Sequence, residues 1–124
     1  MRYFKSDNTA AVCPPVLAAL SAANDGASLP YGADSWSARL DAVLAEFFGT
    51  RVKAFTIVSG TAANSLALAT VCPPWGTVLT HCESHIERDE CGAPEFFTGG
   101  AKLSLMEGEQ AKVSVAAFGE RLAW

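Results

Sequence analysis

The chain has 124 residues, of which 50% are apolar and 18% are charged, and its net charge is −4. The length allows one domain with one modest core, and the composition excludes a disordered tail and fits a well-buried globular chain. No basic patch is present, and no apolar run reaches the roughly 18 residues of a membrane helix. We therefore expect neither a nucleic-acid partner nor a membrane-bound protein.

The N-terminal sequence and the cysteines point to a cellular compartment. The opening residues, "MRYFKSDNTA", lack the apolar core of a signal peptide. The chain's four cysteines, which show no disulfide-framework spacing, are expected to be free thiols. We therefore expect a cytoplasmic protein.

Two helices are predicted in the first half of the chain, after a polar arm over residues 1–10. The segment "CPPVLAALSAANDG" (13–26) has two prolines that suit a first helical turn. In "SWSARLDAVLAEFFG" (35–49), apolar residues recur at the spacing of one helix face. Ser35 is its expected N-cap, and Gly49 occupies the place of the glycine that ends a helix.

The second half alternates strands and helices. Strands are predicted at "AFTIVSG" (54–60), "GTVLTH" (76–81) and "AKLSLME" (101–107). A helix at "TAANSLALATVC" (61–72) follows the first of them, and Ser114 begins a last helix. This order predicts an α/β fold with parallel strands.

The junction "IVSGTAAN" (57–64) places Ser59, Gly60 and Thr61 between a strand and a helix N-terminus. Free backbone N–H groups and the positive end of the helix dipole make such a junction an anion site, most often for phosphate. The segment lacks the lysine and glycine spacing of a Walker loop and the glycines of the dinucleotide fingerprint. Thr61 can cap the helix and also donate its hydroxyl, and the alternative interpretation of the junction is an ordinary N-cap after a tight turn.

The stretch "ESHIERDECGAPEFF" (83–97) gathers ionisable groups directly behind an apolar strand. The spacing of its histidine and cysteines differs from common zinc frameworks, so no metal is expected. His85 follows a strand end, where parallel sheets bind ligands, and can stack on a flat ring or move a proton. Glu90 lies five positions after His85, so one helical turn does not align them perfectly, but a bend or a short helix can aim both side chains at one pocket. There they would act as ring clamp and proton handler. The alternatives are a surface histidine and a solvated acidic face.

Four segments together resemble the low-specificity L-threonine aldolases, which are β-eliminating lyases that use pyridoxal phosphate and have the aspartate-aminotransferase-like fold. The resemblance covers nearly the whole chain in order, through "FKSDNTA" (4–10), "PYGAD" (30–34), "VSGTAANSLAL" (58–68) and "ESHIERDECGAPEFF" (83–97). It implies the N-terminal part of a large α/β domain over residues 1–124, with an arm and first helix at 1–34 and the start of the sheet at 35–124. The trailing "APEFF" is expected to pack into the core.

The resemblance also implies roles for individual residues. Ser59, Gly60 and Thr61 would hold the cofactor phosphate, and His85 would stack on the pyridine ring near the substrate hydroxyl. Glu90 would be the acid beside it, with Asn64 facing the same pocket. The remaining matches are Ser6, which would bind the substrate carboxylate, and Tyr31 with Gly32, which would approach an active site at a subunit boundary.

The implied reaction is cleavage of L-threonine, L-allo-threonine or a related β-hydroxy-α-amino acid to glycine and an aldehyde by a homo-oligomer, a dimer or tetramer. None of the chain's four lysines lies in the context of the family's cofactor-anchoring lysine. We therefore expect a piece of a longer enzyme that ends before this lysine, is inactive alone, and leaves a sheet edge and apolar surface exposed. The alternatives are a non-catalytic assembly module with the same fold and a related β-eliminating amino acid lyase.

Overall fold

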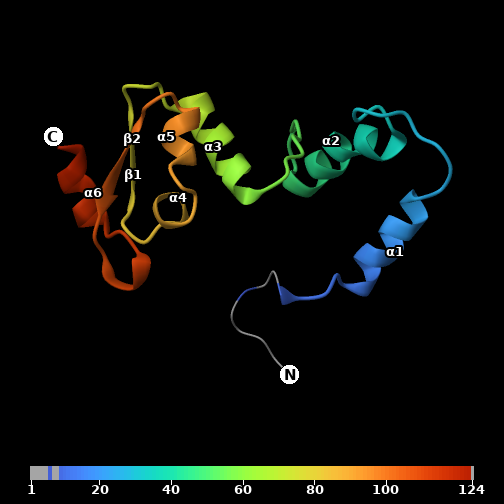
Figure 1. Ribbon diagram of the computed structural model, residues 1–124, viewed down its shortest axis with the longest axis horizontal. Helices are drawn as coiled ribbons and strands as arrows, with labels where there is room; N and C mark the ends of the chain where they lie inside the picture. The colour runs from blue at the N-terminus through green and yellow to red at the C-terminus, as the bar shows by residue number, and fades with distance from the viewer. Residues whose placement is uncertain (1–5, 7–8, 124) are drawn as a thin grey trace. The chain divides into compact units, whose positions relative to one another are not determined.

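The computed structural model describes residue 6 and residues 9–123, so the predicted arm at residues 1–10 lies largely outside the described residues. The chain divides into an N-terminal unit (Met1–Phe55) and a C-terminal unit (Thr56–Trp124) (Figure 1). The N-terminal unit contains helices α1 (Pro14–Ala23) and α2 (Ser35–Phe48). The C-terminal unit contains, in order, α3 (Gly60–Val71), β1 (Thr77–His81), α4 (His85–Arg88), α5 (Ala93–Phe97), β2 (Lys102–Met106), a 3₁₀ turn (Glu109–Ala111) and α6 (Val115–Leu122). No helix within these described segments is long and apolar enough to cross a membrane.

The N-cap of helix α2 lies one residue before the predicted cap, and the helix begins at Ser35. The N-cap is Asp34, whose Oδ1 accepts hydrogen bonds from the backbone N–H groups of Trp36 and Ser37 at 2.9 and 2.8 Å. The prediction of Ser35 as the cap was therefore wrong. A carboxylate carries a full negative charge, which suits the positive end of the helix dipole better than a hydroxyl does. The predicted end is confirmed, because Gly49 adopts the left-handed conformation with φ 65°.

A second carboxylate fastens the chain that follows α2. Asp41 accepts hydrogen bonds from Lys53 Nζ at 2.6 Å and from the backbone N–H of Ala54 at 2.9 Å. The Lys53 hydrogen bond, followed by that of Ala54, lowers the pKa of Asp41 from its ordinary value of 3.8. The side-chain and backbone hydrogen bonds of Ser37 likewise lower the pKa of Asp34.

These shifts predict an acid-sensitive N-terminal unit. A carboxylate whose pKa is lower in the folded chain stabilises the fold above its unfolded pKa, and that contribution is lost as pH falls through the folded pKa. Below about pH 4, α2 should therefore lose helicity, and the substitutions D34N and D41N should each flatten this loss. Circular dichroism of the unmodified chain, D34N and D41N between pH 6 and 2 measures this loss of helicity, with D25N as the control.

Asp25 forms no hydrogen bond or ion pair with any described residue, so D25N should reproduce the unmodified acid profile. An acid profile that is the same for D34N, D41N and the unmodified chain would contradict the assignment of this stability to the two carboxylates.

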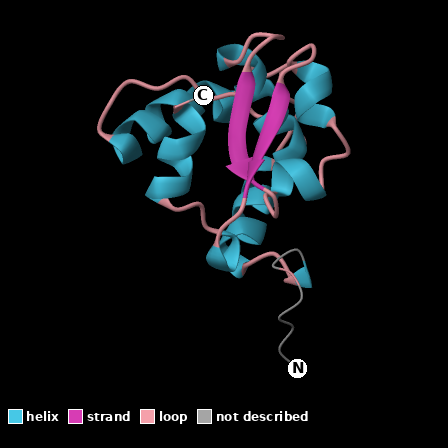
Figure 2. Ribbon diagram, turned by 90° about the vertical axis from the view of Figure 1, so that its left-hand side faces the viewer, coloured by secondary structure: helices cyan, strands magenta, loops and turns pink. Residues whose placement is uncertain are grey.

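The sheet of the C-terminal unit consists of two parallel strands. Strand β1 pairs with β2 from Thr77 opposite Lys102 to His81 opposite Met106. Figure 2 shows the two arrows side by side and pointing the same way. Because parallel strands require a crossover, the chain between them forms the short helices α4 and α5. Both strands, α3, and the last helix after Ser114 were predicted and are confirmed.

The predicted strand at 54–60 was wrong. Residues 54–57 have no regular secondary structure, and Phe55, Ile57 and Val58 are exposed. A β-branched, aromatic sequence favours a strand only if another strand supplies its hydrogen bonds and covers its side chains. No described strand pairs with this segment.

Buried side chains in the C-terminal unit are few and mostly polar. The buried apolar residues are Pro94, Ala101 and Met106, and the buried polar residues are Ser65, His81, Glu90 and Thr98. The expectation of a well-buried apolar core is therefore wrong for the described residues, whereas the expected exposed apolar surface is confirmed by large hydrophobic residues exposed in both units. Two strands give one small sheet, which can cover only a few side chains.

The segment "APEFF" also differs from its prediction. Helix α5 packs against α3, and Pro94 is buried. Phe96 and Phe97 are exposed and contact one another edge to face, with ring centroids 5.2 Å apart. The five residues of α5 form little more than one turn, so burying one face leaves the two adjacent rings outside.

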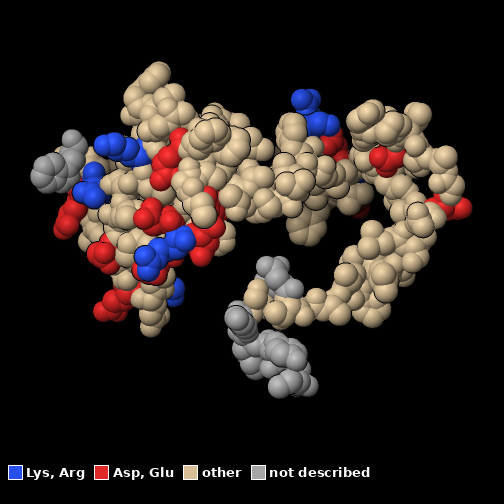
Figure 3. Space-filling view, viewed as in Figure 1, with Lys and Arg blue, Asp and Glu red and all other residues tan. Residues whose placement is uncertain are grey.

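Charged side chains of both signs lie on the face of the C-terminal unit shown in Figure 3. Within this unit Arg88 and Glu83 form an exposed ion pair at 3.2 Å. Such exposed pairs contribute little to stability. The buried polar residues are therefore the more informative groups in this unit.

Candidate active site

The junction before α3 has the geometry of an anion site. Ser59 is the N-cap, and its Oγ accepts a hydrogen bond from the backbone N–H of Ala62 at 3.2 Å. Thr61, which the sequence also allowed as a cap, lies inside the helix, because Ser59 precedes the first helical residue and is extended, with φ −156° and ψ 162°.

Two backbone donors remain at this junction. The N–H groups of Gly60 and Thr61 have no acceptor among the described residues, as expected for the first residues of a helix. Apart from its chain neighbours and its own helix backbone, nothing lies within 4 Å of the position that a Cβ on Gly60 would occupy. The backbone of Gly60 is therefore open to a ligand on that side.

A second group of polar side chains meets at Glu90. The Oε1 atom of Glu90 lies 2.8 Å from His85 Nδ1 and 2.7 Å from Asn64 Nδ2. The side chain of Glu90 has 0% exposure, whereas that of His85 is 64% exposed. The predicted convergence of His85 and Glu90 is confirmed.

The backbone explains why a spacing of five residues brings these two side chains together. Helix α4 is a single turn that begins at His85, with Ser84 as its N-cap. Asp89 leaves the helical conformation with φ −127° and ψ 3°, and Cys91 and Gly92 then have positive φ. The chain therefore reverses directly after α4, which returns the Glu90 carboxylate to the His85 ring.

The hydrogen bonds select one protonation pattern for His85. A carboxylate oxygen only accepts, so the hydrogen bond to Glu90 requires a proton on His85 Nδ1. In the neutral ring, Nε2 is then an acceptor on an exposed side chain. A buried carboxylate holding an exposed imidazole in this way is a common arrangement for a general base.

The hydrogen bonds of His81 require the opposite tautomer, and they stabilise the fold. Its Nδ1 accepts the backbone N–H of Glu83 at 2.9 Å, so its Nε2 donates to the carbonyl oxygen of Gly108 at 3.1 Å. Both ring nitrogens of this buried side chain are used. His81 therefore ties the end of β1 to the chain after β2.

The cysteines do not form a metal centre with these residues. All four cysteines are free, and no group of three or more His, Cys, Asp or Glu that could hold a metal ion occurs in the parts of the chain that the structure describes. The thiol of Cys82 donates to Glu107 Oε2 at 3.3 Å, and this hydrogen bond raises the pKa of the thiol. Cys82 is therefore held as a thiol rather than as a reactive thiolate.

Two of the predicted site residues belong to the N-terminal unit. The carbonyl oxygen of Ser6 accepts hydrogen bonds from the backbone N–H and Oγ1 of Thr9. Tyr31 and Gly32 both have positive φ, of 60° and 76°, in a turn that leaves the Tyr31 ring exposed. Positive φ is uncommon for a tyrosine, and such strain is often found at functional sites. The roles of Ser6 and Tyr31 stay predictions.

Helix α3 joins the two parts of the site in the C-terminal unit. Gly60 begins the helix and Asn64 is four residues later, which is about 6 Å along the axis at about 1.5 Å per residue. The anion site and the His85–Glu90 pair are therefore connected through one rigid element. The hydrogen bond that connects them joins residues 26 positions apart, and no local pattern of the sequence could have revealed it.

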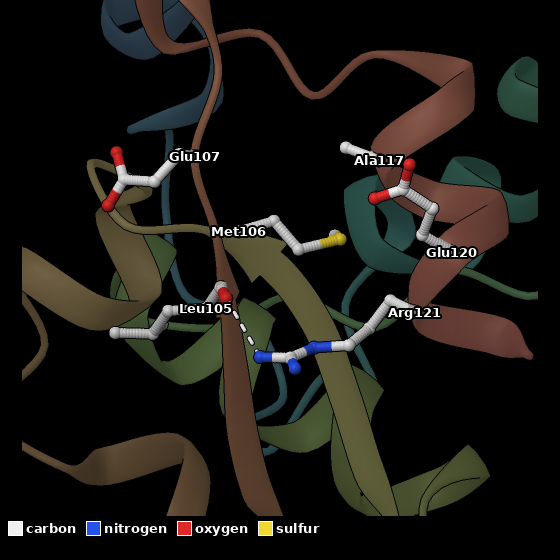
Figure 4. A pocket seen from close by; sticks show the side chains of 6 residues that line it. All are labelled: Leu105, Met106, Glu107, Ala117, Glu120 and Arg121. Atoms are coloured by element: carbon white, nitrogen blue, oxygen red, sulfur yellow. Dashed lines mark hydrogen bonds between the residues drawn. The ribbon is translucent and has the colours of Figure 1, made fainter. Parts of the chain in front are cut away.

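A separate hollow lies between β2 and α6 (Figure 4). Its volume is about 260 Å³, and Leu105, Met106, Glu107, Ala117, Glu120 and Arg121 line it. The Nη2 atom of Arg121 donates to the carbonyl oxygen of Leu105 at 3.2 Å, which satisfies a backbone group of β2. None of the predicted site residues lines this hollow.

Comparisons with known proteins show which family and fold the chain resembles. The family model described as "Beta-eliminating lyase" matches residues 3–123. A low specificity L-threonine aldolase from Pseudomonas aeruginosa is 44% identical over 115 residues, with 93% of this chain and 33% of that protein covered. A low specificity L-threonine aldolase from a Pseudomonas species is 42% identical over 117 residues, with 94% of this chain and 34% of that protein covered. The chain thus spans about a third of the length of these curated relatives.

A solved structure supports the fold. The structure of Leishmania major threonine aldolase matches with a TM-score of 0.81 and 25% identity, covering 93% of this chain and 33% of that one. This match confirms the predicted fold class, and the family match confirms the predicted resemblance.

Proposed function

The chain belongs to the beta-eliminating lyase family, and from this premise we propose that it contributes an active site for the cleavage of L-threonine, L-allo-threonine or a related β-hydroxy-α-amino acid to glycine and an aldehyde. The observation that carries the proposal is the His85–Glu90 pair beside the anion site of α3. The relatives' names supply the substrate class.

The residues at the start of α3 fit the phosphate of pyridoxal phosphate. The N–H groups of Gly60 and Thr61 would donate to phosphate oxygens, with the helix dipole favouring the negative charge. A hydroxyl can accept and donate at once, so Ser59 can cap Ala62 and still donate to phosphate. When bound, pyridoxal phosphate would supply the electron sink for carbon–carbon bond cleavage.

The His85–Glu90 pair would handle the proton. Nε2 of His85 would accept the proton of the substrate's β-hydroxyl group, while Glu90 holds Nδ1 and stabilises the cation that forms. The exposed ring face of His85 would also cover the cofactor ring. The proposal includes contacts from Ser6 and Tyr31 to the substrate, as the resemblance implies.

The wider setting is also a proposal. We place residues 1–124 within the large domain of such an enzyme, acting in the cytoplasm as a dimer or tetramer. Its many exposed large hydrophobic residues support assembly, because monomers rarely expose so much apolar surface. No lysine in the chain matches the family's cofactor lysine, so the 124 residues alone should release no glycine.

Two other functions would compete with this one. A related lyase would eliminate the β-substituent instead of cleaving the carbon–carbon bond, and an assembly module would bind no cofactor. The exposed His85 Nε2 favours cleavage, because it offers a base to a substrate hydroxyl.

Ser59 and Ser114 provide a matched test of the cofactor site. Both are N-cap serines whose Oγ accepts from the backbone N–H three residues later, at 3.2 and 3.1 Å. S59A and S114A should each cost about 1 kcal/mol of stability. Only S59A should weaken binding of pyridoxal phosphate. The loss of one charge-assisted hydrogen bond should raise the dissociation constant by about tenfold, which a ³¹P NMR titration measures.

Pyridoxal without phosphate serves as the second control, since it should bind both variants and the unmodified chain equally weakly. Equal phosphate-dependent binding by S59A and S114A would contradict the assignment of the phosphate to the start of α3.

A further inference from the structure

Glu90 has two partners, and the second is Asn64. Asn64 Nδ2 donates to Glu90 Oε1 at 2.7 Å, the same oxygen that accepts from His85 Nδ1. We infer that Asn64 is a positioning residue, whose side-chain amide keeps the Glu90 carboxylate in place and so keeps the proton of His85 on Nδ1. The inference rests on the proposed function, because it concerns the base that function requires.

Because Glu90 is buried, a single hydrogen-bond donor is insufficient to hold its carboxylate in place. A carboxylate withdrawn from water needs hydrogen bonds to offset its desolvation, and here its side chain is fully buried. Oε2 has no partner within the described part of the chain, so both known donors act on Oε1. Without Asn64, the carboxylate regains water by leaving its buried position, and Oε1 then moves away from His85.

The chemistry of the Asn64 side chain suits this purpose. An amide donates a hydrogen bond without carrying charge, so Glu90 keeps the full negative charge that favours a proton on His85 Nδ1. A lysine here would neutralise that charge, and an aspartate would repel it. Helix α3 is rigid, so the amide reaches Glu90 from a fixed point.

The tautomer of His85 gives a direct readout. The chain has only two histidines, and their hydrogen bonds require opposite neutral tautomers. His85 should carry its proton on Nδ1 and His81 on Nε2. The ¹⁵N spectrum of histidine-labelled chain, recorded about two pH units above the ordinary histidine pKa, separates the two patterns.

The test compares N64L with T70L, which places a leucine on the same helix. Thr70 Oγ1 donates only to the carbonyl of Ala67 within α3, so T70L should leave both histidines unchanged. N64L should lower the ratio of the Nδ1–H to the Nε2–H tautomer of His85 by about tenfold, as expected from losing one hydrogen bond to a charged group. N64Q, which keeps an amide donor, should restore most of the ratio.

The backbone amide signals of β1 and β2 report whether the variant folds, because an unfolded C-terminal unit would lose the pairing of these two strands. With these amide signals unchanged, an unchanged or increased Nδ1–H share for His85 in N64L would overturn the inference, since the two donors would then merely compete for Oε1. The spectra contain no cofactor, so this outcome is separate from failure of the proposed function, which would appear as loss of phosphate-dependent binding in the Ser59 experiment.

Discussion

Replacing His85 with phenylalanine should lower the rate of glycine release by 10² to 10⁴-fold, the usual contribution of a positioned proton acceptor. The assay uses a chimaera in which this chain replaces the matched third of the Pseudomonas aeruginosa aldolase, with L-threonine as substrate. Phenylalanine keeps a flat ring to cover the cofactor and removes Nε2. Bound pyridoxal phosphate, measured by absorbance, should therefore change little while turnover falls.

Two further chimaeras sharpen this result. E90Q keeps an acceptor oxygen for His85 and Asn64 but removes the charge, so turnover should also fall. R88A removes only an exposed ion pair on the same short helix and should stay within about twofold of the parent. Full activity in H85F would show that His85 transfers no proton in the rate-limiting step.

Replacing Gly108 with alanine should destabilise the C-terminal unit by about 3 kcal/mol or more, at the upper end of overpacking costs. The added Cβ would clash with the backbone carbonyl of Lys112 and would approach Val113 Cα to 3.4 Å. Backbone atoms cannot move aside as a side chain would. The same substitution shifts the Gly108 carbonyl that accepts from His81, so the tie between β1 and the chain after β2 weakens as well.

Gly119 is the matched control for this substitution. It lies within α6, and outside its chain neighbours and the helix's own backbone nothing would lie within 4 Å of its added Cβ. G119A should therefore stabilise the chain by about 0.5–1 kcal/mol, because alanine favours a helix interior. Urea unfolding followed by the NMR amide signals of β1 and β2 measures both changes, and a G108A midpoint equal to that of the parent would refute the account of this turn.

The elements that the sequence predicted correctly are those with strong local signals. Helix α1 follows from its two prolines, α2 from its apolar spacing, and β1 and β2 from short apolar runs bounded by glycine or proline. The failed strand at 54–60 has an equally strong local sequence but no partner strand among the described residues. Strand formation depends on a neighbour, which a local pattern does not contain.

The caps of α2 and α3 show why local sequence leaves the exact start of a helix open. Asp34 and Ser35 are both good caps, as are Ser59 and Thr61, and the choice depends on which residue is the last to have an extended backbone. The exposed ring of Phe96 shows the same limit, since a short helix buries only the face that meets its neighbour. The sequence identifies such residues as apolar, but it does not tell which of them face the neighbouring helix.

The candidate site likewise has some features that the sequence predicts and others that it does not. The sequence predicted an anion site at Ser59–Thr61 and a bend that joins His85 to Glu90, and the distance between these two side chains confirms the second. It could not predict that Asn64 donates to Glu90, because that contact depends on how α3 packs beside the reversed chain after α4. It also could not show that His81 and His85 have opposite hydrogen-bond patterns.

The most direct test of the proposed reaction is the identity of the products formed from L-threonine. The chimaera should release glycine and acetaldehyde in equal amounts, only when pyridoxal phosphate is present, because cleavage of the Cα–Cβ bond divides the substrate into these two molecules. A folded, cofactor-loaded chimaera that instead produces ammonia and 2-oxobutyrate would show β-elimination and contradict the proposal of aldol cleavage. The same preparation yielding no product would contradict the proposal that this chain supplies a working His85–Glu90 pair.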